Sequence, residues 1–90
     1  MFTVQAFDLQ LIDGIQLLSV PRGTLIFDVG IVPGKGVVLF GRVDTEQQLE
    51  DRTYLLLAPD ASLPDDPMST FEPFRSINVA GRWYHIFEIT

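Results

Sequence analysis

The sequence predicts an all-β fold, a small antiparallel barrel or sandwich of about seven strands built from hairpins. Short apolar runs are separated by Gly, Pro and Asp at close intervals along the 90 residues. No run repeats its apolar residues at the 3.6-residue period of a long helix, so we expect at most one helical turn. A chain of this length has room for one domain, residues 1–90.

The clearest predicted hairpin joins 24–32 to 37–43 through the turn sequence Pro33-Gly34-Lys35-Gly36, where two glycines can adopt positive φ. This glycine-rich stretch lacks the spacing and the hydroxyl residue of a phosphate-binding loop, so we interpret it as a turn. Residues of the first strand alternate between two faces. The face that we expect to point toward the core holds Leu25, Phe27, Val29 and Ile31. The outer face holds Thr24, Asp28 and Gly30, with Ile26 as an apolar exception.

The first twenty residues predict a second pair of strands, 2–8 and 15–20. Asp13-Gly14 supplies turn chemistry between them. Pro21-Arg22-Gly23 then separates this pair from the central hairpin.

The segment 44–51 is polar and acidic, and Thr45 with Gln48 fits a capping box for a single helical turn. The next strand, 52–58, is apolar on both faces, which is typical of a central or covered strand.

Residues 59–73 contain four prolines and four acids. Because proline removes a backbone donor, we expect a long loop here and no ladder strand. The chain then predicts a terminal hairpin of 74–79 and 82–89 around a two-residue turn, Ala80-Gly81. In its last strand Trp83, His85 and Phe87 share one face.

Composition excludes several classes of function. There is no cysteine, and no apolar run is long enough to span a bilayer. The first residues lack the basic region of a signal peptide, so we expect a cytosolic protein without membrane contact. Twelve acids against six bases give a formal charge of −6, which argues against direct binding to nucleic acid. Yet 47% of the residues are hydrophobic and the mean hydropathy is +0.24, so part of the apolar surface needs a cover.

Two segments resemble a family of small phage and prophage proteins of unknown function. One is Asp13-Gly14-Ile15-Gln16-Leu17 with Val20-Pro21-Arg22-Gly23-Thr24-Leu25-Ile26, and the other is the ending Trp83-Tyr84-His85-Ile86-Phe87-Glu88. The chain departs from the family where Phe40 replaces a Trp, where Arg75-Ser76 replaces a Gly-Thr step, and in its proline-rich loop. The resemblance implies a viral origin and the host cytoplasm as location, and it assigns no catalytic residue.

The candidate site residues belong to binding and not to catalysis. His85 is the single histidine, and Ser76 is placed across the hairpin from it, but no nucleophile elbow surrounds that serine. The acids do not follow a calcium-loop pattern, so we expect no metal and no cofactor. Arginines beside aromatic residues are typical of interfaces, and the acidic loop offers a docking surface for a basic partner. The predicted contact residues are Arg75, Arg82, Trp83, His85, Asp60, Asp65 and Asp66.

These observations predict a phage accessory protein, without enzymatic activity, that blocks a host protein of antiviral defence. One alternative is an oligomeric sponge that holds a small anionic, nucleotide-like signal with Arg75, Arg82, Trp83 and His85. A further alternative is a structural module of the virion. The apolar excess is concentrated in strands that are apolar on both faces, chiefly 52–58 and 82–89. We therefore also expect a homo-oligomer, a dimer.

Overall fold

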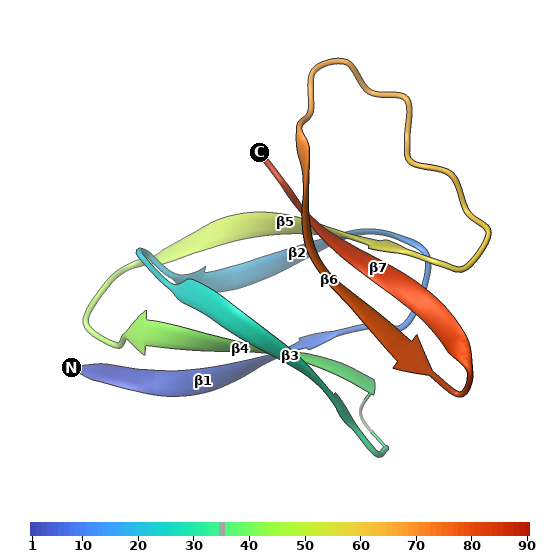
Figure 1. The fold of residues 1–90 in the computed structure, drawn as a ribbon. Helices are drawn as coiled ribbons and strands as arrows, with labels where there is room; N and C mark the ends of the chain where they lie inside the picture. Colours follow the sequence, from blue (N-terminus) through green and yellow to red (C-terminus); the bar gives the residue numbers. More distant parts are fainter. Residues whose placement is uncertain (35) are drawn as a thin grey trace. The chain divides into compact units, whose positions relative to one another are not determined.

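The computed structural model describes residues 1–34 and 36–90 and confirms the all-β prediction. Its two sheets have the orders β1-β4-β3 and β2-β5-β7-β6, so the described strands do not close into a single barrel. None of the described segments is a helix with the length and apolarity needed to cross a membrane. The seven strands are β1 (Phe2–Leu9), β2 (Gly14–Pro21), β3 (Leu25–Val32), β4 (Gly36–Asp44), β5 (Leu49–Leu57), β6 (Phe71–Val79) and β7 (Arg82–Ile89) (Figure 1).

The chain divides into two compact units. Unit 1 comprises Met1–Leu11 and Leu18–Arg52, and unit 2 comprises Ile12–Leu17 and Thr53–Thr90. The three-stranded sheet lies entirely in unit 1, whereas the hairpin of β6 and β7 lies in unit 2.

In unit 1, β4 is the central strand of the three-stranded sheet. It pairs antiparallel with β1 from Phe2↔Asp44 to Leu9↔Val37, and its other edge pairs antiparallel with β3. Val37, Leu39 and Val43, at alternate positions of β4, point to one side and are fully buried, and Val38 is buried on the other side. The buried apolar residues of this unit are Leu9, Val20, Val37, Val38, Leu39 and Val43.

The prediction for the two faces of β3 is wrong. Leu25, Phe27 and Ile31 are exposed, whereas Thr24 on the opposite side is buried. A bulge between Ile26 and Asp28 shifts the register against β4, and it makes Phe27 the extra residue. The side of β3 that faces inward is instead the one next to Gly41 of β4. The missing side chain of Gly41 leaves room there for Ile26 and Thr24. Since both faces of this strand carry apolar residues, alternation alone could not show which one points inward.

The predicted pairing of the first two strands is also wrong. β1 pairs with β4 and β2 with β5, so the two strands lie in different sheets. Asp13 accounts for part of this arrangement, because its carboxylate accepts a hydrogen bond from the backbone N–H of Ala58 at 2.9 Å. The connection is thereby tied to the end of β5 within unit 2 and does not close a hairpin.

The predicted capping box at 44–51 does not form. The Thr45 hydroxyl donates to the carbonyl of Met1, and the carbonyl of Gln48 accepts from the backbone N–H of Arg22. Strand β5 therefore begins at Leu49, three residues before the predicted start. Its residues 54–57 are buried on both faces, as the sequence predicts for a central strand, and β5 lies between β2 and β7. This strand accordingly needs no second copy of the chain to cover it.

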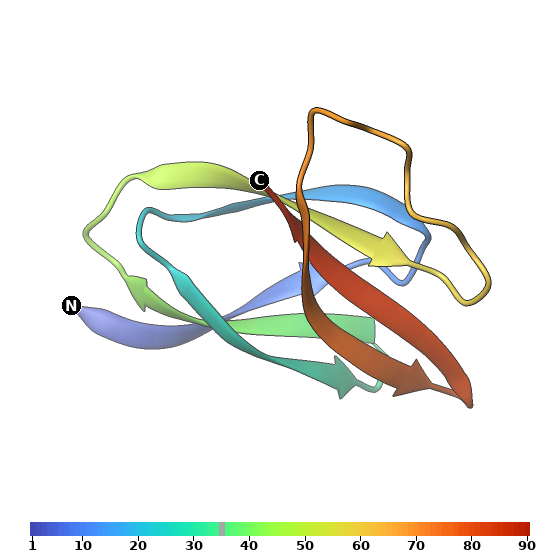
Figure 2. The same ribbon diagram turned by 45° about the horizontal axis from the view of Figure 1, so that its top comes forward.

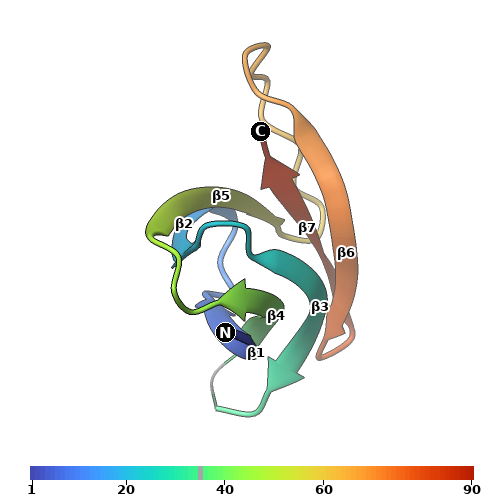
Figure 3. The same cartoon turned by 90° about the vertical axis from the view of Figure 1, so that its left-hand side faces the viewer.

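The terminal hairpin confirms the predicted two-residue turn. Val79 pairs with Arg82, and Ala80 and Gly81 have φ of 53° and 83°. Figure 3 shows β6 and β7 running side by side up to this turn. The start of β6 was predicted too late, because the strand begins at Phe71 and includes Pro73. Proline fits here since β6 is an edge strand and a register shift follows Pro73.

The long proline-rich segment between β5 and β6 has no regular structure over 58–70, as its composition predicts (Figure 2). It returns to the sheet where Thr70 and Thr90 exchange two backbone hydrogen bonds of 3.0 Å. In the turn between β3 and β4, Lys35 lies outside the described residues.

Candidate functional site

The outer face of the three-stranded sheet gathers exposed apolar side chains around one arginine. Arg42 of β4 is paired with Val4 of β1 on one side and with Leu25 of β3 on the other, so these three side chains form one row. Phe2 precedes Val4 by two residues and therefore lies on the same face. The bulge residue Phe27 lines a surface depression together with these residues. We call this set the Phe2 face: Phe2, Val4, Leu25, Phe27 and Arg42.

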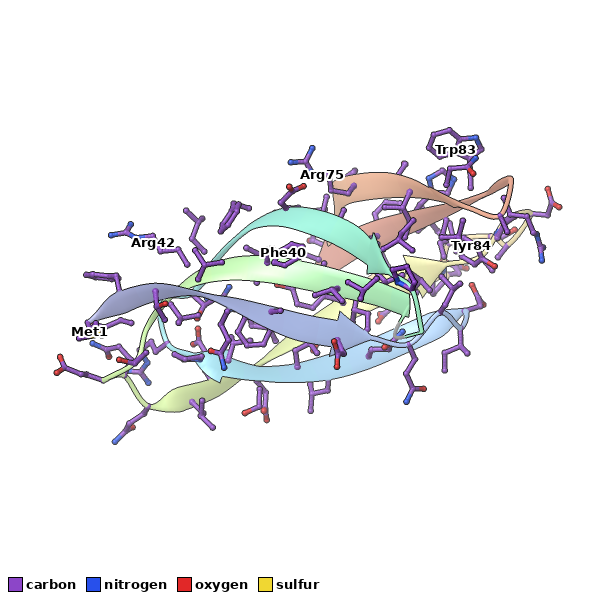
Figure 4. The ribbon with its side chains drawn as sticks, turned by 90° about the horizontal axis from the view of Figure 1, so that it is seen from below. Met1, Phe40, Arg42, Arg75, Trp83 and Tyr84 are labelled. Carbon is purple, nitrogen blue, oxygen red and sulfur yellow. The ribbon has the colours of Figure 1, made fainter. Side chains whose placement is uncertain are left out.

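An open depression of about 350 Å³ lies on this face, and Thr3 completes its lining. The guanidinium carbon of Arg42 lies 4.3 Å from the centroid of the Phe2 ring, within the range of a cation–π contact. Figure 4 shows Arg42 at the end of the sheet where β1 begins, beside Met1. In the described part of the chain, no carboxylate lies within ion-pair distance of Arg42.

The exposed area of the Phe2 face is large for so small a chain. Phe2 is 62% exposed and Phe27 is 45% exposed, so the two rings alone leave roughly 200 Å² of aromatic surface accessible. Val4 and Leu25, each more than half exposed, extend it. Contiguous apolar patches of a few hundred Å² on a small protein commonly mark interaction sites.

Sequence reasoning missed this face. It placed the apolar excess in 52–58 and 82–89, whereas residues 54–57 are buried and much of the exposed apolar surface lies on β1, β2 and β3. One signal was available. The odd positions of β3 and the first three even positions of β1 are apolar, so two edge strands of one sheet carry apolar residues that the core does not need.

The predicted contact residues of the terminal hairpin do not converge. Arg75 pairs with Ile86, and Val79 pairs with Arg82, so by alternation the two arginines lie on one face of the hairpin. Trp83 and His85 lie on the other face. Figure 4 shows Trp83 and Tyr84 projecting from opposite sides of the ribbon. The four residues proposed to hold an anionic ligand are therefore divided between two faces.

Ser76 and His85 face each other across the hairpin, as the sequence suggested. They are register partners, and the distance from Ser76 Oγ to His85 Nδ1 is 2.7 Å. A hydrolytic triad also needs an acid that orients the histidine. The described residues place no carboxylate within hydrogen-bond distance of His85. The pair is thus a polar contact between β6 and β7.

The three acids predicted for docking, Asp60, Asp65 and Asp66, all lie in the 58–70 loop and are exposed. Asp60 has a positive φ of 65°, typical of a turn residue. Asp66 closes a turn, because its carboxylate accepts from the Ser69 hydroxyl at 2.7 Å and from the Met68 N–H at 3.0 Å. These two hydrogen bonds lower the pKa of Asp66, and the one from Ser69 has the larger effect.

A second acid with a lowered pKa lies at the end of β4. The main cause of the lowered pKa of Asp44 is the hydrogen bond from the backbone N–H of Glu46, followed by the one from the amino group of Met1 at 3.2 Å. Like the hydrogen bonds of Asp66, the one from Glu46 to Asp44 lies within a turn.

Throughout the described residues, no three His, Asp or Glu side chains gather as a metal site would require. Comparison with known proteins found no protein family, no curated protein and no solved structure that matches this chain.

Proposed function

We propose that this protein acts by binding a protein partner, without catalysing a reaction, and that the partner docks on the Phe2 face. The observation that supports the proposal is the exposed apolar depression with Arg42 at its edge, a cation that has no ion-pair partner among the described residues. Aromatic residues and arginine are the residue types enriched where interfaces bind most tightly.

The composition of the face also indicates the chemistry of the partner. Phe2, Phe27 and Leu25 favour apolar side chains, because each buried methylene group stabilises a complex by about 0.8 kcal/mol. Arg42 favours a carboxylate next to them, because charge-assisted hydrogen bonds to guanidinium are strong in a partly dry site. The expected partner segment therefore carries one or two large apolar residues and an acid.

A selection from a displayed random-peptide library tests this proposal. The purified chain serves as bait, and a Phe27→Asp variant removes peptides that bind elsewhere. We expect enriched peptides with apolar residues beside Asp or Glu. Calorimetry with a synthetic copy should then show that Phe2→Ala and Phe27→Ala each weaken binding about tenfold, or about 1.4 kcal/mol. The matched control is Leu49→Ala, because Leu49 is equally exposed but lies outside the Phe2 face.

Two outcomes contradict the proposal. Enriched peptides that bind the Phe27→Asp variant as well as the original chain would place the binding surface elsewhere. A chain that sediments as a dimer, and becomes monomeric on Phe27→Asp substitution, would show that a second copy covers this face.

A finer proposal is that the partner is a host protein of antiviral defence, met in the host cytoplasm. Its support is the resemblance of the chain's two ends to small phage proteins. Capture from host lysate with the original chain and the Phe27→Asp variant in parallel tests it. We expect a defence protein that the variant fails to retain, whereas identical captured sets would contradict it.

A further inference from the structure

From the register of the terminal hairpin we infer a second binding site, for a neutral sugar, on the face that carries Trp83. This site is independent of the Phe2 face and lies within unit 2. Two rungs of the β6–β7 ladder form it, one on either side of the Ile77–Tyr84 rung: Asn78 opposite Trp83, and Ser76 opposite His85. We call these four residues the Trp83 face.

The Trp83 face holds no carboxylate, lysine or arginine side chain of the hairpin. The hairpin, residues 71–89, contains four charged residues. The register places all of them on the opposite face: Glu72, Arg75, Arg82 and Glu88. This separation argues against an anionic ligand at Trp83, since no arginine shares its face. It favours a ligand that is neutral and forms many hydrogen bonds.

Trp83 supplies the stacking surface. It is the single tryptophan of the chain and is 55% exposed, although burial of an indole is strongly favourable. A pyranose ring has an apolar face of C–H groups that carry partial positive charge. Such a face complements the negative face of an indole ring. An exposed tryptophan on a sheet thus offers a flat platform for a sugar ring.

The Ser76–His85 pair supplies the polar contacts. If the Ser76 hydroxyl donates to Nδ1, then Nε2–H of His85 remains a donor and Ser76 Oγ keeps a free lone pair. If Nδ1–H donates instead, the Ser76 hydroxyl is the free donor and Nε2 is the acceptor. Either tautomer presents one donor and one acceptor, which is the pattern that a sugar hydroxyl matches.

Asn78 adds a donor on the other rung. Its Oδ1 accepts from the backbone N–H of Gly81 at 3.1 Å, which fixes the amide and turns its NH₂ group away from the turn. Successive rungs on one face lie about 7 Å apart, comparable to the width of one sugar ring. A ring stacked on Trp83 can therefore reach the hydroxyl and imidazole of the next rung.

The test uses Trp83 itself as the probe. The purified chain is titrated with cellohexaose, maltohexaose, mannohexaose, xylohexaose and N-acetylchitohexaose, and with AMP as the anionic comparison. We expect a saturable change of tryptophan emission with at least one neutral oligosaccharide and none with AMP at the same concentration. Amide chemical shifts should move in β6 and β7.

Variants separate this site from unspecific stacking. Trp83→Ala should abolish binding measured by amide shifts, and Ser76→Ala and Asn78→Ala should each weaken it about three- to tenfold. Arg82→Ala is the matched control, because it changes the neighbouring residue on the opposite face, and it should leave affinity unchanged. All four positions are exposed, and far-UV circular dichroism checks that each variant folds.

Three results would overturn the inference. The first is that no sugar of the panel shifts the hairpin amides at millimolar concentration. The second is that AMP binds more tightly than every neutral sugar. The third is that Trp83→Ala retains full affinity.

Discussion

The guanidinium of Arg42 lies over the ring of Phe2, with 4.3 Å between its central carbon and the ring centroid. The two residues come from adjacent strands, and Phe2 lies two rungs beyond the Val4–Arg42 pair, on the same face. This contact holds a cation at the edge of an apolar depression, and it links the fold of unit 1 to the proposed docking of a partner.

Replacing Arg42 should separate stability from binding. Because the contact is exposed, Arg42→Gln should lower the free energy of unfolding by no more than about 1 kcal/mol. Affinity for a selected acidic peptide should fall about tenfold, since a charge-assisted hydrogen bond is lost. Urea denaturation and calorimetry measure the two quantities. Arg82→Gln is the control and should change neither, and an equal loss of affinity in that variant would refute the role of Arg42.

Gly41 should resist substitution. A Cβ at this position would lie 2.9 Å from Ile26 Cδ1, 2.9 Å from Thr24 Cγ2 and 3.2 Å from Phe7 Cε2, on the inward side of the sheet. We expect Gly41→Ala to destabilise the chain by about 1–3 kcal/mol in urea denaturation.

Gly30→Ala is the matched substitution for Gly41. There the added Cβ meets only the Phe40 ring, at 3.0 Å, on the outer side where the ring can move. Its loss of stability should be clearly smaller. Equal losses in the two variants would mean that the inward packing of Ile26 and Thr24 is not tight.

The terminal hairpin should gain stability from Ala80→Asn. Ala80 has a φ of 53°, which costs a residue with a Cβ about 1 kcal/mol, whereas asparagine tolerates this conformation and is favoured before glycine in two-residue turns. A gain of about 0.5–1 kcal/mol in unfolding free energy is expected. Gly81→Ala places a Cβ at a φ of 83° and should be destabilising. A loss of stability in Ala80→Asn would argue against this turn.

Asp66 should titrate below its ordinary range. Its pKa is lowered from 3.8, first by the Ser69 hydroxyl and then by the Met68 N–H. A carboxyl group with a lowered folded pKa stabilises its turn at pH above the unfolded pKa, and this contribution is lost as pH falls through the folded pKa. Carboxyl carbon NMR should show the low pKa and its rise toward 3.8 in Ser69→Ala. An unchanged pKa in that variant would show that the turn does not form.

The strands were predictable because their signals are local. Apolar runs, the glycine turn after β3 and the Ala80-Gly81 turn each act over a few residues, and they place all seven strands to within a few residues. Pairing between distant strands was not predictable. The distribution of β1 and β2 over two sheets depends on contacts such as that of Asp13 with Ala58, across 45 residues of sequence.

The sites were harder to predict for a related reason. The Ser76–His85 pair follows from hairpin register and was foreseen. The same register places Arg75 opposite Ile86, so the separation of Arg75 from Trp83 could also have been read from the sequence. The Phe2 face depends on the bulge at Phe27 and on the choice of Gly41 as the inward position. An alternating apolar pattern is the same whether its face is buried in a core or kept for a partner.

Hydrogen–deuterium exchange of the chain, with and without a saturating selected peptide, tests the central claim most directly. Docking on the Phe2 face predicts slower exchange in β1 and β3, with the amides of β6, β7 and the 58–70 loop unchanged. Protection confined to the terminal hairpin or to that loop, with β1 and β3 unaffected, would contradict it.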